Sequence, residues 1–144
     1  LKDPYDAKIR ADLLSSLRTN GKLLELQAVF NRASKLADKS DLNTNILGPE
    51  KIIDESLFES QCEFDLLSIL REIEPLALAN TYDRYTHLVE KLVLASKNLQ
   101  EFFDGQNSVM VMSKEIDIRT NRLNLLALLR NQAFELADFT RING

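Results

Sequence analysis

Two arginines, Arg119 and Arg122, stand in the run Ile118–Leu123, where helical periodicity resumes after an irregular stretch. A guanidinium carries a rigid fork of donors that suits carboxylates, phosphates and base edges. At a helical rotation near 100° per residue, Arg122 falls inside the apolar arc and Arg119 at its edge. A charged side chain on the inward face of a helix needs a partner of opposite charge or a hydrogen-bond acceptor. For Arg122 two interpretations stay open: an ion pair with a carboxylate such as Asp104, or contact with RNA at the open end of a helical bundle.

Three more cations, Arg32, Lys35 and Lys39, follow one another at helical spacing and share one side of a predicted helix. Such a ladder is either a solvated face or a stripe that contacts a phosphate backbone. The formal net charge is −4. This argues against a sequence-blind nucleic-acid binder, which needs a basic surface, but it is compatible with reading a few splayed bases of an RNA loop.

No pattern in the sequence predicts a catalytic centre or a metal site. There is no glycine-rich phosphate loop, no Gly-x-Ser-x-Gly and no cluster with zinc-ligand spacing. The single histidine, His87, is expected on the surface, and the single cysteine, Cys62, in the core. The carboxylates look scattered over outer faces without a convergent pair. Asn121 and Asn124 are expected to be solvated.

Helical periodicity in every long segment, with few glycines and prolines, predicts an all-α bundle of about five helices. The expected helices run from Pro4 to Thr19, from Lys22 to Lys39, from Ser56 to Ala79, from an Asn80 or Thr81 cap to Phe103, and from a Ser113 cap to Asp138. Pro75 is expected to kink or interrupt the third helix. The stretch 40–55 is expected to be a surface loop, and 109–112 an apolar connector rather than a strand.

The composition suits a single soluble domain. The chain has 144 residues, of which 44% are hydrophobic and 28% charged. No apolar run is long enough to span a membrane. A lone cysteine is compatible with a reducing compartment. The absence of an initiator methionine suggests a segment cut from a longer protein.

The last third of the chain carries a resemblance to a known family. Its pieces are, in order, Phe102-Phe103-Asp104, Val109-Met110-Val111-Met112 and the run from Ile118 to Leu123. This order resembles the C-terminus of the β subunit of bacterial-type glycyl-tRNA synthetase. The chain departs from the pattern with Gly105-Gln106-Asn107-Ser108, which lengthens the loop before Val109. Looser matches upstream are Leu57-Phe58-Glu59 and the segment Val29–Arg32.

The resemblance implies that 1–144 is one helical anticodon-binding domain, of the type shared with arginyl-tRNA synthetase, at the C-terminal end of a longer β chain. In that family the α subunit makes glycyl-adenylate from ATP and glycine, and the β subunit grips the tRNA. The implied partners are glycine tRNA and, through the full β chain, the α subunit. ATP and magnesium serve the whole enzyme, so no cofactor is expected in this domain. The implied location is the cytoplasm, or a plastid or other organelle in a eukaryote.

Five side chains are the candidate tRNA contacts: Arg32, Lys35, Lys39, Arg119 and Arg122. Two alternatives remain at this point. One is the matching domain of arginyl-tRNA synthetase, although the chain's tail Ala137–Ile142 follows the glycyl pattern. The other is a helical scaffold for protein interaction, which predicts a large exposed apolar patch and no affinity for tRNA.

Overall fold

The computed structural model describes residues 22–78, 84–104 and 109–134, together with the isolated residues 8, 11, 12 and 15. These residues form α-helices and one 3₁₀ turn, with no strand among them: α2 (Lys22–Ala37), η1 (Glu55–Leu57), α3 (Gln61–Leu78), α4 (Arg84–Asp104) and α5 (Ile116–Ala133). The all-α prediction is confirmed, with four α-helices in the described part of the chain instead of five. The expected helix 4–19 lies outside the described residues, except for those four isolated positions.

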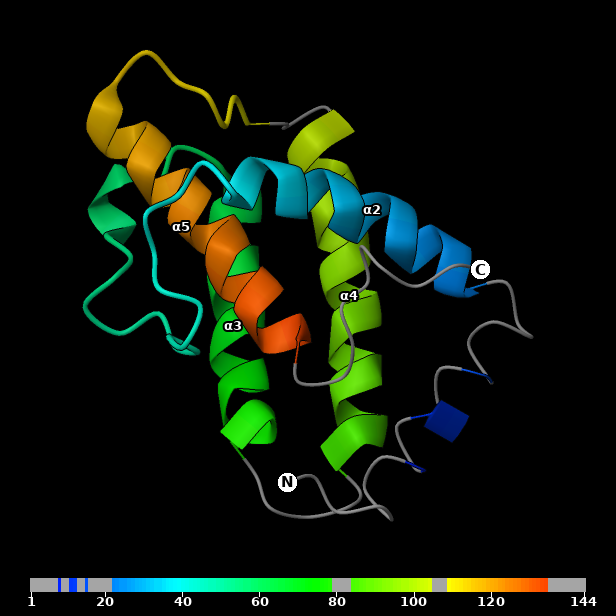
Figure 1. Ribbon diagram of the computed structural model, residues 1–144. Helices are drawn as coiled ribbons and strands as arrows, with labels where there is room; N and C mark the ends of the chain where they lie inside the picture. Colours follow the sequence, from blue (N-terminus) through cyan, green and yellow to red (C-terminus); the bar gives the residue numbers. More distant parts are fainter. Residues whose placement is uncertain are drawn as a thin grey trace.

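The helices pack as two crossed layers. Figure 1 shows α3 and α4 side by side, with α2 crossing α4 and α5 crossing α3. Each helix turns an apolar stripe toward the centre, as amphipathic helices in a bundle do. The core residues contributed by α2, α3 and α4 include Leu26, Phe30, Leu66, Leu70, Ile73, Leu88, Leu92, Leu99 and Phe102. A single core therefore joins all four helices.

Apolar periodicity predicts that α4 packs inward through Tyr82, Tyr85, Val89, Leu92, Ser96, Leu99 and Phe103. This prediction is right in part. Leu92 and Leu99 have no exposed surface, as expected, but the buried seam also includes Leu88, Ala95 and Phe102. These positions alternate steps of four and three residues, which is the spacing of a helix-packing seam. The seam is thus rotated slightly from the predicted one, and Val89 and Phe103 are only partly buried.

Helix α3 begins later than predicted and passes through its proline. Residues 55–57 form the separate turn η1, where Asp54 accepts a hydrogen bond from the Ser56 backbone N–H. Pro75 lies inside α3, which continues to Leu78, so it does not interrupt the helix. A proline costs one backbone hydrogen bond and a local clash, and the burial of Ile73 and Leu70 on the same helix outweighs that cost.

Helix α5 is surrounded by the rest of the fold. It starts at Ile116 after Glu115, not at a Ser113 cap; the Ser113 hydroxyl instead accepts the Glu115 N–H at 3.2 Å. Every residue from Asn121 to Ala133 except Asn124 is buried. Helices α2 and α3 cover two sides of α5. Its expected extension to Asp138 lies outside the described residues.

The irregular stretch 40–55 lies on the surface as predicted, but amide side chains of α5 hold it in place. The Asn121 side chain binds both the N–H and the carbonyl of Asp54, at 2.8 and 2.9 Å. The Asn131 amide donates to the carbonyls of Asn43 and Ile46, at 3.0 and 2.9 Å. Since Asn121 is only 4% exposed, the prediction that it is solvated is wrong: the loop needs side-chain partners for its backbone groups.

Candidate nucleic-acid interface

A pocket of about 260 Å³ opens between the chain leaving α2 and the N-terminal half of α5. It is lined by Lys39, Ser40, Asp41, Leu42, Thr120, Leu123 and Asn124. The pocket combines an apolar part, from the two leucines, with polar and charged groups. This mixture of surfaces suits a flat heterocycle with polar edges.

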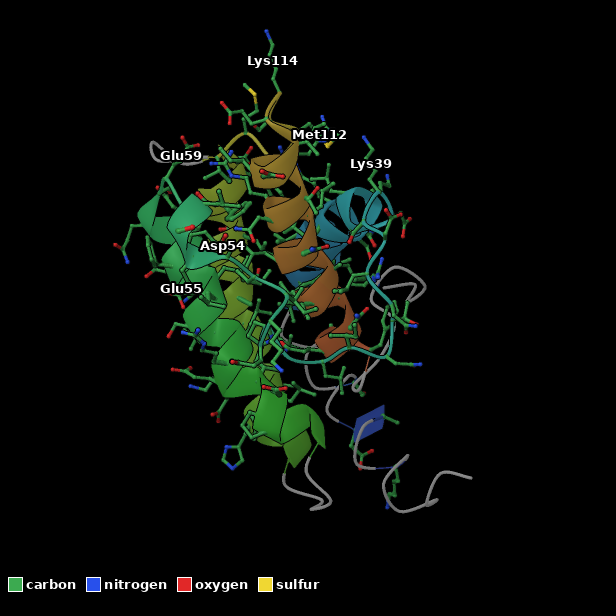
Figure 2. The ribbon with its side chains drawn as sticks, turned by 90° about the vertical axis from the view of Figure 1, so that its left-hand side faces the viewer. Lys39, Asp54, Glu55, Glu59, Met112 and Lys114 are labelled. Carbon is green, nitrogen blue, oxygen red and sulfur yellow. The ribbon has the colours of Figure 1, made fainter. Side chains whose placement is uncertain are left out.

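The end of α2 gives the pocket its first wall. The helix ends at Ala37, and two tight backbone hydrogen bonds follow, from Lys39 N–H to the Leu36 carbonyl and from Ser40 N–H to the Ala37 carbonyl. Lys39 therefore lies in the turn after the helix, not in its last turn as predicted. Figure 2 shows its side chain reaching outward at this end of the molecule.

A hydrogen bond ties this wall to α5. The Ser40 hydroxyl donates to Asn124 Oδ1 at 2.6 Å, while its oxygen accepts the Leu42 N–H at 3.1 Å. Asn124 is partly buried and its Oδ1 accepts from Ser40, so the prediction that it is solvated is right only in part. The Ser40–Asn124 bond fixes the loop at a set distance from α5 and so keeps the pocket's shape.

Of the three cations Arg32, Lys35 and Lys39, the first forms an ion pair with α4. Arg32 Nη1 donates to both carboxylate oxygens of Asp104, at 2.9 and 3.0 Å, and its guanidinium lies 4.5 Å from the centre of the Phe103 ring. Lys35 is exposed on the same helix. Arg32 is therefore engaged with α4, and Lys35 and Lys39 are the cations of the ladder for which no ion pair is found in the described part of the chain.

Arg122 is a buried structural charge, but its predicted partner is wrong. Its side chain is 5% exposed and pairs with Glu63, which is 0% exposed, and with Glu59, which is 64% exposed. The Nη1 group also donates to the Met110 carbonyl at 2.7 Å. Asp104 pairs with Arg32 instead, because it ends α4 beside α2.

These contacts also correct the expectation of no convergent carboxylates. Glu59 and Glu63 both reach the guanidinium of Arg122, with N···O distances between 2.8 and 3.2 Å. The sequence held a signal for this pair. Glu63 stands three and seven residues before Leu66 and Leu70 and so lies on the buried stripe of α3.

Arg119 lies in the first turn of α5. It is partly buried, and its Nη1 donates to the Ser113 carbonyl at 3.3 Å. It lies one helical turn before Leu123, which lines the pocket. The structure thus brings Arg119 and Lys39 to the same end of the bundle, whereas Arg122 lies inside.

The run Val109–Met112 is a connector without strand structure, as expected. Val111 is 6% exposed and tucks into the core, while Met110 and Met112 are 68% and 42% exposed. Ile116, at the start of α5, is 66% exposed. Figure 2 shows Met112 and Lys114 at the same end of the molecule as Lys39. An apolar and cationic surface therefore lies at the same end of the molecule as Lys39.

Two sequence predictions about reactive side chains are confirmed. His87 is exposed, 3.8 Å from Glu90, and the Cys62 side chain is buried to 3% exposure. Within the described ranges, no group of three or more histidine, cysteine or acidic side chains is arranged to hold a metal ion.

One carboxylate at the surface is electrostatically perturbed. The Ser56 hydroxyl donates to Asp54 Oδ1 at 2.6 Å, and the Ser56 N–H donates to the same atom at 3.0 Å. These bonds stabilise the ionised carboxylate and lower the pKa of Asp54 from its ordinary value, against a small opposing effect of burial. The perturbation belongs to the cap of η1, away from the pocket's lining residues.

No helix in the described part of the chain is long and apolar enough to cross a membrane.

Comparison with known proteins confirms the resemblance found in the last third and extends it over the chain. The glycine–tRNA ligase β subunit of Gloeothece citriformis is 42% identical over 143 residues, and that of Acaryochloris marina is 39% identical over 146 residues, each match covering 99% of the chain. The Acinetobacter baumannii protein of the same name is 29% identical. No protein-family model and no solved structure matches. The chain spans 20% of the length of these relatives and is homologous to that segment of them.

Proposed function

We propose that the chain is the C-terminal anticodon-binding segment of a glycine–tRNA ligase β subunit. It holds the anticodon region of glycine tRNA and so orients the acceptor end toward the α subunit, which makes glycyl-adenylate from ATP and glycine. The observation that carries this proposal is the 42% identity over 99% of the chain to a glycine–tRNA ligase β subunit. The similarity to these β subunits favours a domain of glycyl-tRNA synthetase over the matching domain of arginyl-tRNA synthetase. The enzyme would work in the cytoplasm, or in an organelle of a eukaryote.

The geometry of one end of the bundle supports an RNA-reading role. Recognition of an RNA loop rests on hydrogen bonds to unstacked bases and on contact with their faces, more than on a large positive field. A chain with a net charge of −4 has to work in this way, because it cannot neutralise many phosphates. The pocket beside Lys39, with Arg119 one turn away on α5, offers such contacts on a small scale. Lys35 extends the positive charge along α2.

The five candidate contacts divide into distinct roles. Lys35 and Lys39 are proposed to contact phosphates, and Arg119 to contact a base at the open end of α5. Arg32 contributes only if the exposed ion pair with Asp104 opens. Arg122 supports the surface from inside through the Met110 carbonyl, and we assign it no direct contact with RNA.

A second candidate function is a protein-docking surface. Met110, Met112 and Ile116 are exposed within a few residues of one another. Exposed apolar groups that cluster in this way favour a binding surface for another protein. In this reading the α subunit, or another part of the β chain, covers the end of the bundle, and the segment has no affinity for tRNA.

A titration with tRNA distinguishes these functions. The full-length β subunit is titrated with glycine tRNA and with the same tRNA carrying another anticodon. We expect tighter binding of glycine tRNA, with a salt dependence that corresponds to about two to four phosphate contacts. Lys35→Ala and Lys39→Ala should weaken binding to both tRNAs alike, whereas Arg119→Ala should reduce the preference for the glycine anticodon.

Lys97→Ala supplies the matched control, because Lys97 is an exposed lysine in α4 that lines a different groove. Its binding should equal that of the parent protein. Equal affinity of the parent for the two tRNAs would contradict the anticodon-binding proposal and favour the docking surface.

A further inference from the structure

The pocket beside Lys39 is slightly smaller than the pockets that enclose drug-sized ligands and has room for one base. Pockets for drug-sized ligands enclose about 300–1,000 Å³, and this one encloses about 260 Å³. Leu42 and Leu123 give it apolar surface for the faces of a ring. Lys39 stands at the exposed side, where the phosphate of a bound nucleotide would meet its charge. A single nucleobase turned out of a loop meets both conditions.

Among the polar side chains that line the pocket, Asn124 and Asp41 have hydrogen-bonding groups that can face the edge of a base. Because Ser40 Oγ accepts the Leu42 N–H and donates to Asn124 Oδ1, the Asn124 Nδ2 group keeps two protons for another acceptor. Within the described residues, no hydrogen bond of Nδ2 is found. The Asp41 carboxylate is exposed and likewise has no hydrogen bond or ion pair to a described residue. The pocket therefore presents the Asn124 Nδ2 donor and the Asp41 carboxylate acceptor, together with the Thr120 hydroxyl, which can act as either, and the Lys39 ammonium at its exposed side.

Together, Asn124 and Asp41 complement the pairing edge of cytosine. Cytosine offers an amino group as donor beside a ring nitrogen and a carbonyl as acceptors, and a carboxylate is a common partner of its amino group. Uracil places a carbonyl where cytosine has the amino group, so a carboxylate repels it. Guanine also carries adjacent donors and an acceptor. Glycine codons begin with two guanines, however, so every glycine anticodon ends in two cytosines. The proposed function therefore favours cytosine over guanine as the bound base.

We infer that the pocket between 39–42 and α5 binds one of the two cytosines of the glycine anticodon. Asp41 accepts from the cytosine amino group, Asn124 donates to its ring nitrogen or carbonyl, and Lys39 contacts the adjoining phosphate. This inference rests on the proposed function and adds to it the base, the pocket and the residues that determine specificity.

The test is a change of specificity. The full-length β subunit is titrated with glycine tRNA and with two transcripts that carry uridine in place of one or the other cytosine. The parent protein should prefer cytosine to uridine at one of these positions by about 5- to 150-fold, as expected for one base-edge contact. Asp41→Asn replaces the carboxylate by an amide, which can donate to the uracil carbonyl. It should reduce that preference by about tenfold, largely through tighter binding of the uridine transcript.

A second variant tests the donor. Asn124→Asp keeps an acceptor for the Ser40 hydroxyl but removes the Nδ2 protons, so it should weaken binding of the cytosine tRNA without loss of thermal stability. The charge-matched controls are Asp117→Asn, in the first turn of α5, and Asn45→Asp, in the loop after the pocket; both residues are exposed. They should leave the ratio of cytosine to uridine binding unchanged.

The outcomes separate the two proposals. If the parent protein does not distinguish glycine tRNA from an anticodon-swapped tRNA, the proposed function fails. If it does distinguish them, but Asp41→Asn and Asn124→Asp leave the ratio of cytosine to uridine binding unchanged, the anticodon is read elsewhere and the pocket assignment is wrong. A change of the ratio by Asp117→Asn as large as that by Asp41→Asn would also overturn the assignment.

Discussion

Replacing Arg122 by alanine should destabilise the fold strongly, because it leaves a buried carboxylate without its partner. The Arg122 side chain makes hydrogen bonds to Glu63, Glu59 and the Met110 carbonyl, at 2.7 to 3.2 Å. Glu63 has no exposed surface, whereas Glu59 is 64% exposed. Water can hydrate Glu59 after the substitution but cannot reach Glu63 without opening the core.

The magnitude follows from this difference in exposure. Removing one partner of a buried ion pair costs about 3–5 kcal/mol of unfolding free energy. The exposed pair with Glu59 contributes about 0–1 kcal/mol. We therefore expect Arg122→Ala to lower the unfolding free energy by about 3–5 kcal/mol, nearly all of it through Glu63. Glu59→Gln should lower it by no more than about 1 kcal/mol.

The assay is urea unfolding of the chain at neutral pH, followed by far-ultraviolet circular dichroism and fitted to a two-state transition. A double variant, Arg122→Met with Glu63→Leu, removes both charges and fills the space with apolar groups. It should recover most of the stability that Arg122→Ala loses, because a buried ion pair is often replaceable by apolar packing. A loss below about 1 kcal/mol in Arg122→Ala would refute the argument from burial, as would a double variant no more stable than Arg122→Ala.

Three further substitutions test other parts of the structure. Asn131→Ala leaves two loop carbonyls without their donor and should lower the unfolding free energy by about 1–3 kcal/mol, measured by the same unfolding assay; a loss under about 0.5 kcal/mol would show that water replaces the amide. Arg32→Ala removes an exposed ion pair with Asp104 and should lower the unfolding free energy by no more than about 1 kcal/mol. A larger loss would mean that the contact of Arg32 with the Phe103 ring contributes more than its ion pair. Ser56→Ala should raise the pKa of Asp54 toward its ordinary value in a carboxyl titration followed by nuclear magnetic resonance. Because the folded pKa is the lowered one, the stability that Asp54 adds is present above its unfolded pKa and is lost as pH falls through the folded pKa; an Asp54 pKa unchanged by Ser56→Ala would contradict this origin.

The sequence alone determined the fold class and the need for certain partners. Apolar residues at steps of three and four specify amphipathic helices wherever they recur, so α2, α3, α4 and α5 were expected at nearly their observed places. Cys62 lay on an apolar stripe and is buried. Arg122 stood on the apolar side of its helix, and that position by itself required a partner, either a carboxylate or RNA, because an unpaired charge is too costly to bury.

The tertiary structure decided which groups meet. The partner of Arg122 comes from the start of α3, 59 residues away in the sequence, and helical periodicity within one segment cannot identify a group so distant. For the same reason the buried Asn121 of α5 was expected at the surface, since nothing in the neighbouring sequence indicates a loop that crosses this residue and needs its hydrogen bonds. The pocket beside Lys39 exists only because Ser40, just past the end of α2, reaches Asn124 on α5, 84 residues further along the chain.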